Sequence, residues 1–444
     1  MDFKNKATRI NLFSIGTPQM RTFHITWFAF FLCFFGWFGI APLLAVVRED
    51  LGLTKAQLGN TVIASVFFTI FARLAIGWLC DRIGPRYAYT ALLLFGSLPV
   101  MMIGLSQNYT QFLLFRLAIG AIGASFVITQ YHTSVMFAPN IVGTANATTA
   151  GWGNLGGGVT QMVMPMIFSA VLVFVPDQFL GWRVAMVIPG IALFLTGIAY
   201  YFLTTDAPDG NFGDLRARGE MPPAKDTNGT FLEACKDHRV WALFFIYAAC
   251  FGIELTINGT AALYFFDYFD SVDLRTAGII ASLFGLMNIF ARSMGGIFSD
   301  KLNLSFGLKG RVGYLFAMLF FEGFALMLFS RMSVLMMAIP ALIFFSLFVQ
   351  MSEGATYSIV PYINKRALGS VSGIVGAGGN FGAVAAGFLF KQEAIAWNDA
   401  YMYLGVMVTG AAFLTAFVRF SDTEEAAAKE EMDRRLAEAA ALAS

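Results

Sequence analysis

The chain carries the stretch FARLAIGWLCDRIGPR at residues 71–86, and a shorter version of it returns as FARSMGGIFSDK at residues 290–301. Each copy begins with an arginine inside an apolar run and ends with an acidic residue and a cation. Arg73 and Asp81 of the first copy correspond to Arg292 and Asp300 of the second. A repeat at constant spacing indicates a chain built from two similar halves.

The sequence around both copies is strongly apolar. Of its 444 residues, 57% are hydrophobic and only 13% are charged, whereas soluble domains average roughly 25% charged residues. The apolar residues form long blocks, for example 27–47, 88–105 and 184–203, each about as long as the ~20 residues that a helix needs to cross a bilayer. Backbone amides in lipid must be satisfied within their own segment, so these blocks must be helical. We predict an all-α polytopic membrane protein.

Twelve such spans are predicted, and the long polar stretch between the sixth and the seventh divides them into two sets of six. We expect an N-terminal half at 1–203, a cytoplasmic linker at 204–239, a C-terminal half at 240–420 and a cytoplasmic tail at 421–444. The expected spans are 24–47, 58–80, 88–106, 110–137, 141–174, 184–203, 240–268, 274–299, 312–330, 334–360, 368–390 and 400–420.

The lysines and arginines outside these spans predict the orientation. If both termini and the linker are cytoplasmic, most of these cations lie on the cytoplasmic side, as the positive-inside rule requires. The other side holds only Arg48, Lys55, Arg183, Arg275, Arg331 and Lys391.

Net charge and cysteine usage exclude other classes. A net charge of +1 gives no reason to expect a nucleic-acid partner. The four cysteines have no metal-ligand spacing. We expect no metal and no cofactor, and the chain has no nucleophile–base pair or nucleotide motif that would suggest an enzyme.

Arg73 and Arg292 are the strongest functional candidates. Each precedes its acidic residue by eight positions, which places its Cα roughly 12 Å into the membrane at 1.5 Å per residue, near the middle of a ~30 Å core. Charges at this depth are expensive and mark function. A guanidinium stays charged when desolvated, and its planar fork suits a planar oxyanion. We predict an anion site between the halves; the alternative is that each arginine is bound to a helix carboxylate.

Asn154 and Asn380 occupy two similar glycine-rich stretches, one in each half. Their amides are expected to bond either the ligand or a neighbouring backbone. The glycines are expected to let helices approach closely and slide during a transport cycle; they include Gly151, Gly156, Gly378 and Gly382.

Three acidic residues lie within predicted spans. Glu254 is the preferred proton carrier, because its span should line the cavity and because burial and a nearby arginine act on a carboxyl group in opposite directions. A structural ion pair of Glu254, with Arg116 for example, is the alternative. Glu353 is a second candidate for proton coupling, and Glu322 is expected to have a structural partner.

The first copy of the repeat also resembles the loop signature of major facilitator transporters between their second and third spans. The residues that carry this resemblance are Gly77, Asp81, Arg82, Gly84 and Arg86, and Asp300 belongs to a partial second copy. The resemblance implies that these charges pin the cytoplasmic ends of neighbouring helices and bias the open and closed states.

Over roughly residues 20–420 the chain resembles the nitrate/nitrite porter family of the major facilitator superfamily, most closely its assimilatory high-affinity branch. The stretches that carry this resemblance are MRTFHITWF (20–28), FAR (71–73), AGWGNLGGGVTQ (150–161), GIEL (252–255), QMSEGATY (350–357) and GIVGAGGNFGA (373–383).

The resemblance implies that Arg73 and Arg292 bind nitrate or nitrite, that Asn154 and Tyr247 add hydrogen bonds, and that Phe126 provides an apolar wall. It also implies import for nitrate assimilation, with proton symport, by a protein that functions as a monomer. The chain lacks the long central loop of fungal relatives and the extended tail of plant ones, so we expect a bacterial inner-membrane protein.

Three alternatives stay open at this point. The carrier could exchange nitrate for nitrite, it could carry another anion such as a carboxylate or a phosphate ester, or the fold could serve as a receptor that does not transport.

Overall fold

The structure is a computed structural model that describes residues 5–137, 142–220, 228–364 and 368–430. Within these ranges its regular secondary structure consists of helices and two isolated β-bridges, joined by turns and short loops. Twelve of its helical segments are long and apolar enough to cross a membrane. The predicted fold class is confirmed, and the first span begins earlier than expected, at Pro18.

The first six spans use several broken helices. The α-helices of this half are α1 (Pro18–Phe38), α2 (Leu44–Leu51), α3 (Lys55–Ile83), α4 (Pro85–Met102), α5 (Tyr109–Ile119), α6 (Ser125–Met136), α7 (Val142–Phe174), α8 (Gln178–Ala185) and α9 (Val187–Leu203). Short 3₁₀ turns connect some of them, namely η1 (Ala41–Leu43), η2 (Ile103–Leu105) and η3 (Gly120–Ala124).

The linker contains two short helices, α10 (Phe212–Ala217) and α11 (Asn228–Lys236). The C-terminal half consists of α12 (His238–Tyr268), α13 (Leu274–Leu286), η4 (Met287–Ile289), α14 (Ala291–Ser330), α15 (Leu335–Ile359), η5 (Val360–Tyr362), α16 (Leu368–Phe390), α17 (Trp397–Ala412) and η6 (Phe413–Phe417). Helix α14 contains parts of two spans, joined at Gly307, whose φ of +68° is outside the helical range.

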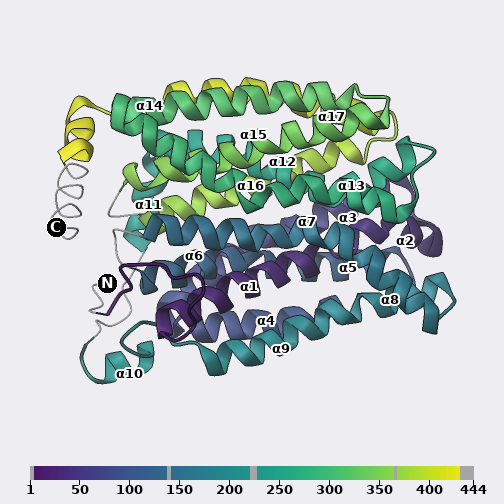
Figure 1. The fold of residues 1–444 in the computed structure, drawn as a ribbon, viewed down its shortest axis with the longest axis horizontal. Coiled ribbons are helices and arrows are strands. Elements are labelled where there is room, and N and C mark those ends of the chain that lie inside the picture. Colours follow the sequence, from purple (N-terminus) through teal and green to yellow (C-terminus); the bar gives the residue numbers. More distant parts are fainter. Residues whose placement is uncertain (1–4, 138–141, 221–227, 365–367, 431–444) are drawn as a thin grey trace.

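The helices run nearly parallel in two groups, one for each half of the chain (Figure 1). The linker helices α10 and α11 and the described parts of both termini lie at one end, here called the terminal face; α2 and α8 lie at the other end, the opposite face (Figure 1). The two halves contact each other mainly through α3 with α16 and through α7 with α13.

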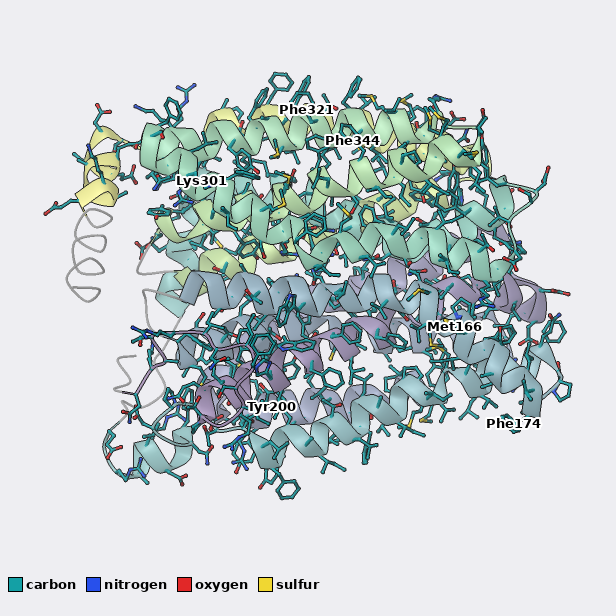
Figure 2. All side chains as sticks on the ribbon, in the orientation of Figure 1. Met166, Phe174, Tyr200, Lys301, Phe321 and Phe344 are labelled. Atoms are coloured by element: carbon teal, nitrogen blue, oxygen red, sulfur yellow. The ribbon has the colours of Figure 1, made fainter. Side chains whose placement is uncertain are left out.

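Large apolar side chains cover much of the outer surface. Phe321 and Phe344 lie at the outer edge of the C-terminal half (Figure 2) and are 47% and 46% exposed. Phe174, at the opposite face, is 86% exposed. Soluble monomers rarely show such extensive apolar surface, and in a bilayer it faces hydrocarbon. The chain is a multi-pass membrane protein.

Each half caps its third span with a carboxylate from beyond its last span. Gly84, with a φ of +90°, leads into α4, and Asp206 accepts a hydrogen bond from the backbone N–H of Arg86 at 2.8 Å. In the second half Glu425 accepts bonds from the N–H groups of Leu308 and Lys309, next to Gly307, at 2.9 and 3.1 Å. These N–H groups belong to helix starts, which need such acceptors.

The signature residues around the first cap join helices of one half. The Nε of Arg86 donates to the carbonyl of Tyr201 at 2.7 Å, which ties α4 to α9. The carbonyl of Arg82 accepts a bond from Arg216 of the linker at 2.5 Å. The side chains of Asp81 and Asp300 lie outside the described part of the structure, and Gly77 has room around it.

Candidate anion site between the halves

Arg73 lies in the middle of α3, and its buried guanidinium reaches into the other half. Its Nη1 donates to the carbonyl of Gly376 in α16 at 2.8 Å, and its Nε lies 3.3 Å from the carbonyl of Gly123, which the 3₁₀ turn η3 leaves available. Its Nη2 is buried without a hydrogen-bond partner among the described residues. No described carboxylate forms an ion pair with it; its ionisable neighbours are Tyr247, Tyr357 and Arg292. Among the described residues, Arg73 therefore keeps a free donor and has no carboxylate partner of its own.

Arg292 has different surroundings. The span that carries it is interrupted at η4, and Phe290, with a φ of −133°, separates η4 from the start of α14. Its Nη1 forms an ion pair with Glu353 of α15 and lies 3.8 Å from Oε2 of Glu254 of α12. Its Nη2 donates to the hydroxyl of Tyr247 at 3.0 Å. The sequence left open that each arginine is bound to a carboxylate on a helix. Among the described residues this holds for Arg292 but not for Arg73.

Glu254 connects the two halves through amide groups. Its Oε1 accepts a bond from Asn288 at 2.8 Å, and its Oε2 lies 3.4 Å from the Nδ2 of Asn154 on α7 of the N-terminal half. Its carboxylate shares Nη1 of Arg292 with the carboxylate of Glu353. Arg116 instead donates to the carbonyl of Trp37 at 3.1 Å. The ion-pair partner of Glu254 is therefore Arg292, and the suggested pairing with Arg116 is wrong.

Aromatic rings enclose the two arginines. The guanidinium of Arg73 lies 5.3 Å from the ring centre of Phe126 and 5.5 Å from that of Phe251. Arg292 lies 6.0 Å from the same Phe251 ring, so the two cations share one aromatic neighbour. Tyr247 stacks on Phe251 with ring centres 5.1 Å apart. Such an apolar enclosure strengthens the electrostatic interactions inside it.

Tyr357 completes the enclosure. Its ring lies 5.0 Å from that of Tyr247 and 5.9 Å from that of Phe126. A Cβ added at Gly376 would lie 3.0 Å from the Tyr357 hydroxyl and 3.8 Å from Nη1 of Arg73. Glycine at this position leaves room beside the guanidinium.

The glycine-rich stretches of α7 and α16 pack closely against the backbone of neighbouring helices. A Cβ at Gly156 would lie 2.0 Å from a carbonyl oxygen of α1, and at Gly378 or Gly382 it would lie 2.2 or 2.1 Å from carbonyl oxygens of α12. At Gly151 it would meet the carbonyl of Asn288 in the other half at 2.9 Å. Asn380 is buried in α16, and neither of its amide atoms has a hydrogen-bond partner among the described residues.

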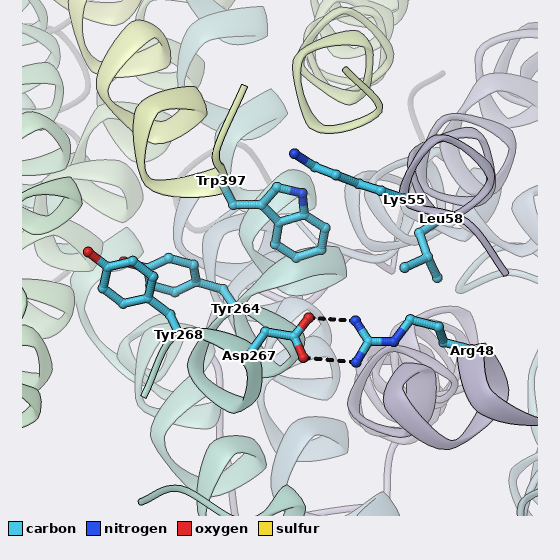
Figure 3. A pocket seen from close by; sticks show the side chains of 7 residues that line it. All are labelled: Arg48, Lys55, Leu58, Tyr264, Asp267, Tyr268 and Trp397. Atoms are coloured by element: carbon cyan, nitrogen blue, oxygen red, sulfur yellow. Dashed lines mark hydrogen bonds and ion pairs between the residues drawn. The ribbon is translucent and has the colours of Figure 1, made fainter. Parts of the chain in front are cut away.

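The halves are joined at the opposite face by charges. Both guanidinium nitrogens of Arg48 donate to Asp267, at 2.6 and 2.9 Å (Figure 3). Lys55 donates to the carbonyl of Ile395. A cavity of about 260 Å³ lies beside the ion pair, and Trp397 and Tyr264 line it (Figure 3). The Arg48–Asp267 ion pair joins α2 of the N-terminal half to α12 of the C-terminal half.

Several of these residues were not predicted from the sequence. Asn288, Phe251, Tyr357 and Gly376 had no assigned role, and Glu353 was expected to carry a proton, not to pair with Arg292. Tyr357 follows Glu353 by one helical turn, a spacing that places both on one face of α15. That spacing was the available signal.

A helical membrane protein with two similar six-span halves and a buried charged site between them belongs to the class of transporters that move a substrate through a central site. The chain matches the Major Facilitator Superfamily over residues 26–387.

Known relatives narrow this class to one family. The chain is 42% identical to high affinity nitrate transporter 2.5 of Arabidopsis thaliana, across 92% of this chain and 81% of that protein. It is 39% identical to high-affinity nitrate transporter 2.3 of Oryza sativa, across 92% and 79%. It is 32% identical to the nitrate/nitrite transporter NrtP of Picosynechococcus sp., across 83% and 84%. The chain belongs to this nitrate/nitrite transporter family of the major facilitator superfamily, as the sequence predicted.

Solved structures agree with the fold. A bacterial homologue of the human lysosomal transporter Spinster, in an inward-facing and occupied conformation, superimposes with a TM-score of 0.71 at 15% identity, across 92% of this chain and 98% of that one. This likeness shows the fold alone. The expectation that the chain is not an enzyme is confirmed by its membership of a transporter family.

Proposed function

We propose that this protein imports nitrate, and also nitrite, by alternating access, and that protons move with the anion. The relatives named above are nitrate and nitrite transporters. The single observation that carries the proposal is the state of Arg73, a buried guanidinium with a free Nη2 and no carboxylate partner in the described structure. A buried cation without a counter-ion is costly, and a small planar anion removes that cost with parallel hydrogen bonds.

In this proposal nitrate binds between Arg73 and Arg292. Asn154, Asn380 and Tyr247 add hydrogen bonds, and Phe126 forms an apolar wall. The oxygens of nitrate lie in one plane, which suits the planar guanidinium groups. The two side-chain amide atoms of Asn380, which have no hydrogen-bond partner among the described residues, are available to a ligand within reach of α16.

Proton coupling follows from competition for Arg292. Because Nη1 of Arg292 is bound to Glu353, nitrate has to loosen that pair in order to reach the guanidinium. A proton on Glu353 neutralises the carboxylate and releases Arg292. The two arginines and the two carboxylates of Glu254 and Glu353 cancel in charge, so nitrate alone would leave one buried negative charge. One proton bound with one nitrate restores neutrality.

The orientation belongs to the same proposal. The terminal face is cytoplasmic, as the lysine and arginine distribution indicates, and the membrane is a bacterial inner membrane. The Arg48–Asp267 pair then closes the outer side, and the protein works as a monomer for nitrate assimilation.

Labelled nitrate uptake into proteoliposomes tests this function. A pH gradient, acidic outside, should drive nitrate accumulation, and the R73A variant should abolish it. If nitrate uptake does not depend on the pH gradient but requires nitrite inside the vesicle, the protein exchanges nitrate for nitrite and is not a proton symporter. If nitrate uptake is not saturable and labelled formate or oxalate is taken up instead, the substrate is a carboxylate and not nitrate.

A further inference from the structure

Glu322 is a third buried carboxyl group, and the site described above does not use it. It lies in α14, next to Phe321, which is at the outer edge of the C-terminal half (Figure 2). Glu322 itself is 0% exposed, and neither of its carboxyl oxygens has a hydrogen-bond partner among the described residues. The structural partner expected from the sequence is not found in that part of the chain.

A carboxylate in these surroundings would be unstable as an ion. Moving a charge out of water without a counter-ion costs several kcal/mol even after the protein relaxes. Buried groups in this situation take up a proton and become neutral. Glu322 is therefore a neutral acid in this conformation.

Glu322 lies close to the proposed coupling residue. The hydroxyl of Ser352, itself buried, lies beside its carboxyl group without the alignment of a formed hydrogen bond. Ser352 directly precedes Glu353 in α15, and Glu322 is near enough to Glu353 for the two charges to repel each other if both groups were ionised. Glu322 thus lies beside the residue next to Glu353 in α15.

No cation faces this carboxyl group from the described parts of the helices packed around it. On α12 its titratable neighbour is Cys250, and on α15 it is Glu353. On α17, Gly405 and Thr409 pack against Gly323, the residue that follows Glu322. Because its neighbours are neutral or acidic, Glu322 releases its proton only in a conformation that admits water between α14 and α15.

We infer that Glu322 carries a second proton with each nitrate, in addition to the proton on Glu353. This inference rests on the proposed symport. One proton makes nitrate import electroneutral, so the membrane potential neither helps nor opposes it. A second proton adds one inward positive charge, so an inside-negative membrane potential then drives import. Glu353 takes up its proton as nitrate binds, whereas Glu322 enters the step with the proton it already holds. Release returns both protons to the cytoplasmic water, and Glu322 regains its proton from the outer water before the next nitrate binds.

The test is the charge moved per nitrate by the full-length protein in proteoliposomes, from labelled nitrate uptake and current measured together. The wild type should move about one positive charge inward per nitrate. E322Q should take up nitrate under a pH gradient with a current near zero, and its nitrate–nitrate counterflow should stay normal. The matched control is C250A, which alters a neighbour of Glu322 without removing a carboxyl group and should keep the wild-type ratio.

The outcomes separate this inference from the proposed function. If the wild type moves no protons with nitrate, the symport proposal fails together with the inference. If the wild type is coupled and E322Q keeps the full current per nitrate, Glu322 is structural and only the inference fails. Should E322Q lose counterflow, S352A takes its place: a lower current per nitrate supports the inference, and an unchanged ratio contradicts it.

Discussion

Arg73 and Arg292 occupy equivalent places in the repeat, but the structure gives them different partners. Arg73 lies inside the continuous helix α3 and bonds backbone carbonyls of Gly376 and Gly123. Arg292 lies at the start of α14, after a break in its span, and is bound to Glu353 with Glu254 nearby. The difference teaches that a repeat in sequence gives two arginines equivalent positions in their halves, whereas neighbouring carboxylates decide whether each guanidinium forms an ion pair.

This asymmetry divides two tasks between the halves. A guanidinium with a free donor attracts an anion in every protonation state of the site. A guanidinium held by carboxylates becomes available only when a proton neutralises one of them. We therefore assign anion binding mainly to Arg73 and proton coupling mainly to the group around Arg292.

Replacing Arg292 should have the largest effect on stability. R292A leaves Glu254 and Glu353 buried without a cation, and breaking a buried pair in this way costs about 3–5 kcal/mol. We expect a large loss of thermal stability in detergent that the R292A/E353Q double variant partly reverses. If R292A and R292A/E353Q are equally stable, the buried Glu353 carboxylate left without a cation is not the cause of the loss.

Replacing Arg73 should mainly affect binding. R73K keeps the charge but loses the planar fork, and no described carboxylate is left unpaired. We expect nitrate affinity to fall about 100-fold, which corresponds to roughly 2.7 kcal/mol, with a nearly unchanged melting temperature. Calorimetric titration and thermal unfolding measure the two effects. A variant that binds normally but unfolds early would reverse the roles of the two arginines.

The ion pair at the opposite face should have a smaller effect, on conformation. Arg48 and Asp267 are 35% and 39% exposed, so their pair contributes about 1 kcal/mol or less after solvent screening. D267N should increase labelling of a cysteine introduced near Trp397 by a few-fold. The charge-swapped variant R48D/D267R should restore protection; if it labels like D267N, the pair does not hold the halves together.

The two helix caps should show the smallest difference between the halves. Asp206 is fully buried, and this burial raises the pKa of its carboxyl group. Glu425 is partly exposed. Losing a cap costs about 0.5–2 kcal/mol, so D206A should lower the melting temperature by a few degrees and E425A by less. If E425A lowers the melting temperature more than D206A does, the cap from the C-terminal tail stabilises the fold more than the cap from the linker.

Much of this architecture follows from the sequence, because apolar block length and the FAR repeat depend on local pattern. The twelve spans are readable in this way, and the depth of both arginines in the membrane stays a prediction. The break at Phe290 and the choice of Glu353 as partner of Arg292 are not readable in this way, because they depend on how α14 packs on α15 and α12. Phe251 was missed because an apolar residue in a membrane helix gives no sign of which face lines the site. Tyr357 was missed although its spacing from Glu353 was readable in the sequence.

The most direct test of the account is the proton uptake that accompanies nitrate binding to the purified protein in weakly buffered detergent solution. If nitrate takes Arg292 from Glu353, the wild type should bind about one proton per nitrate, as charge neutrality of the buried site requires. The E353Q variant should bind nitrate without proton uptake. Nitrate binding to the wild type with no change in bound protons, or the same uptake in E353Q, would contradict the account.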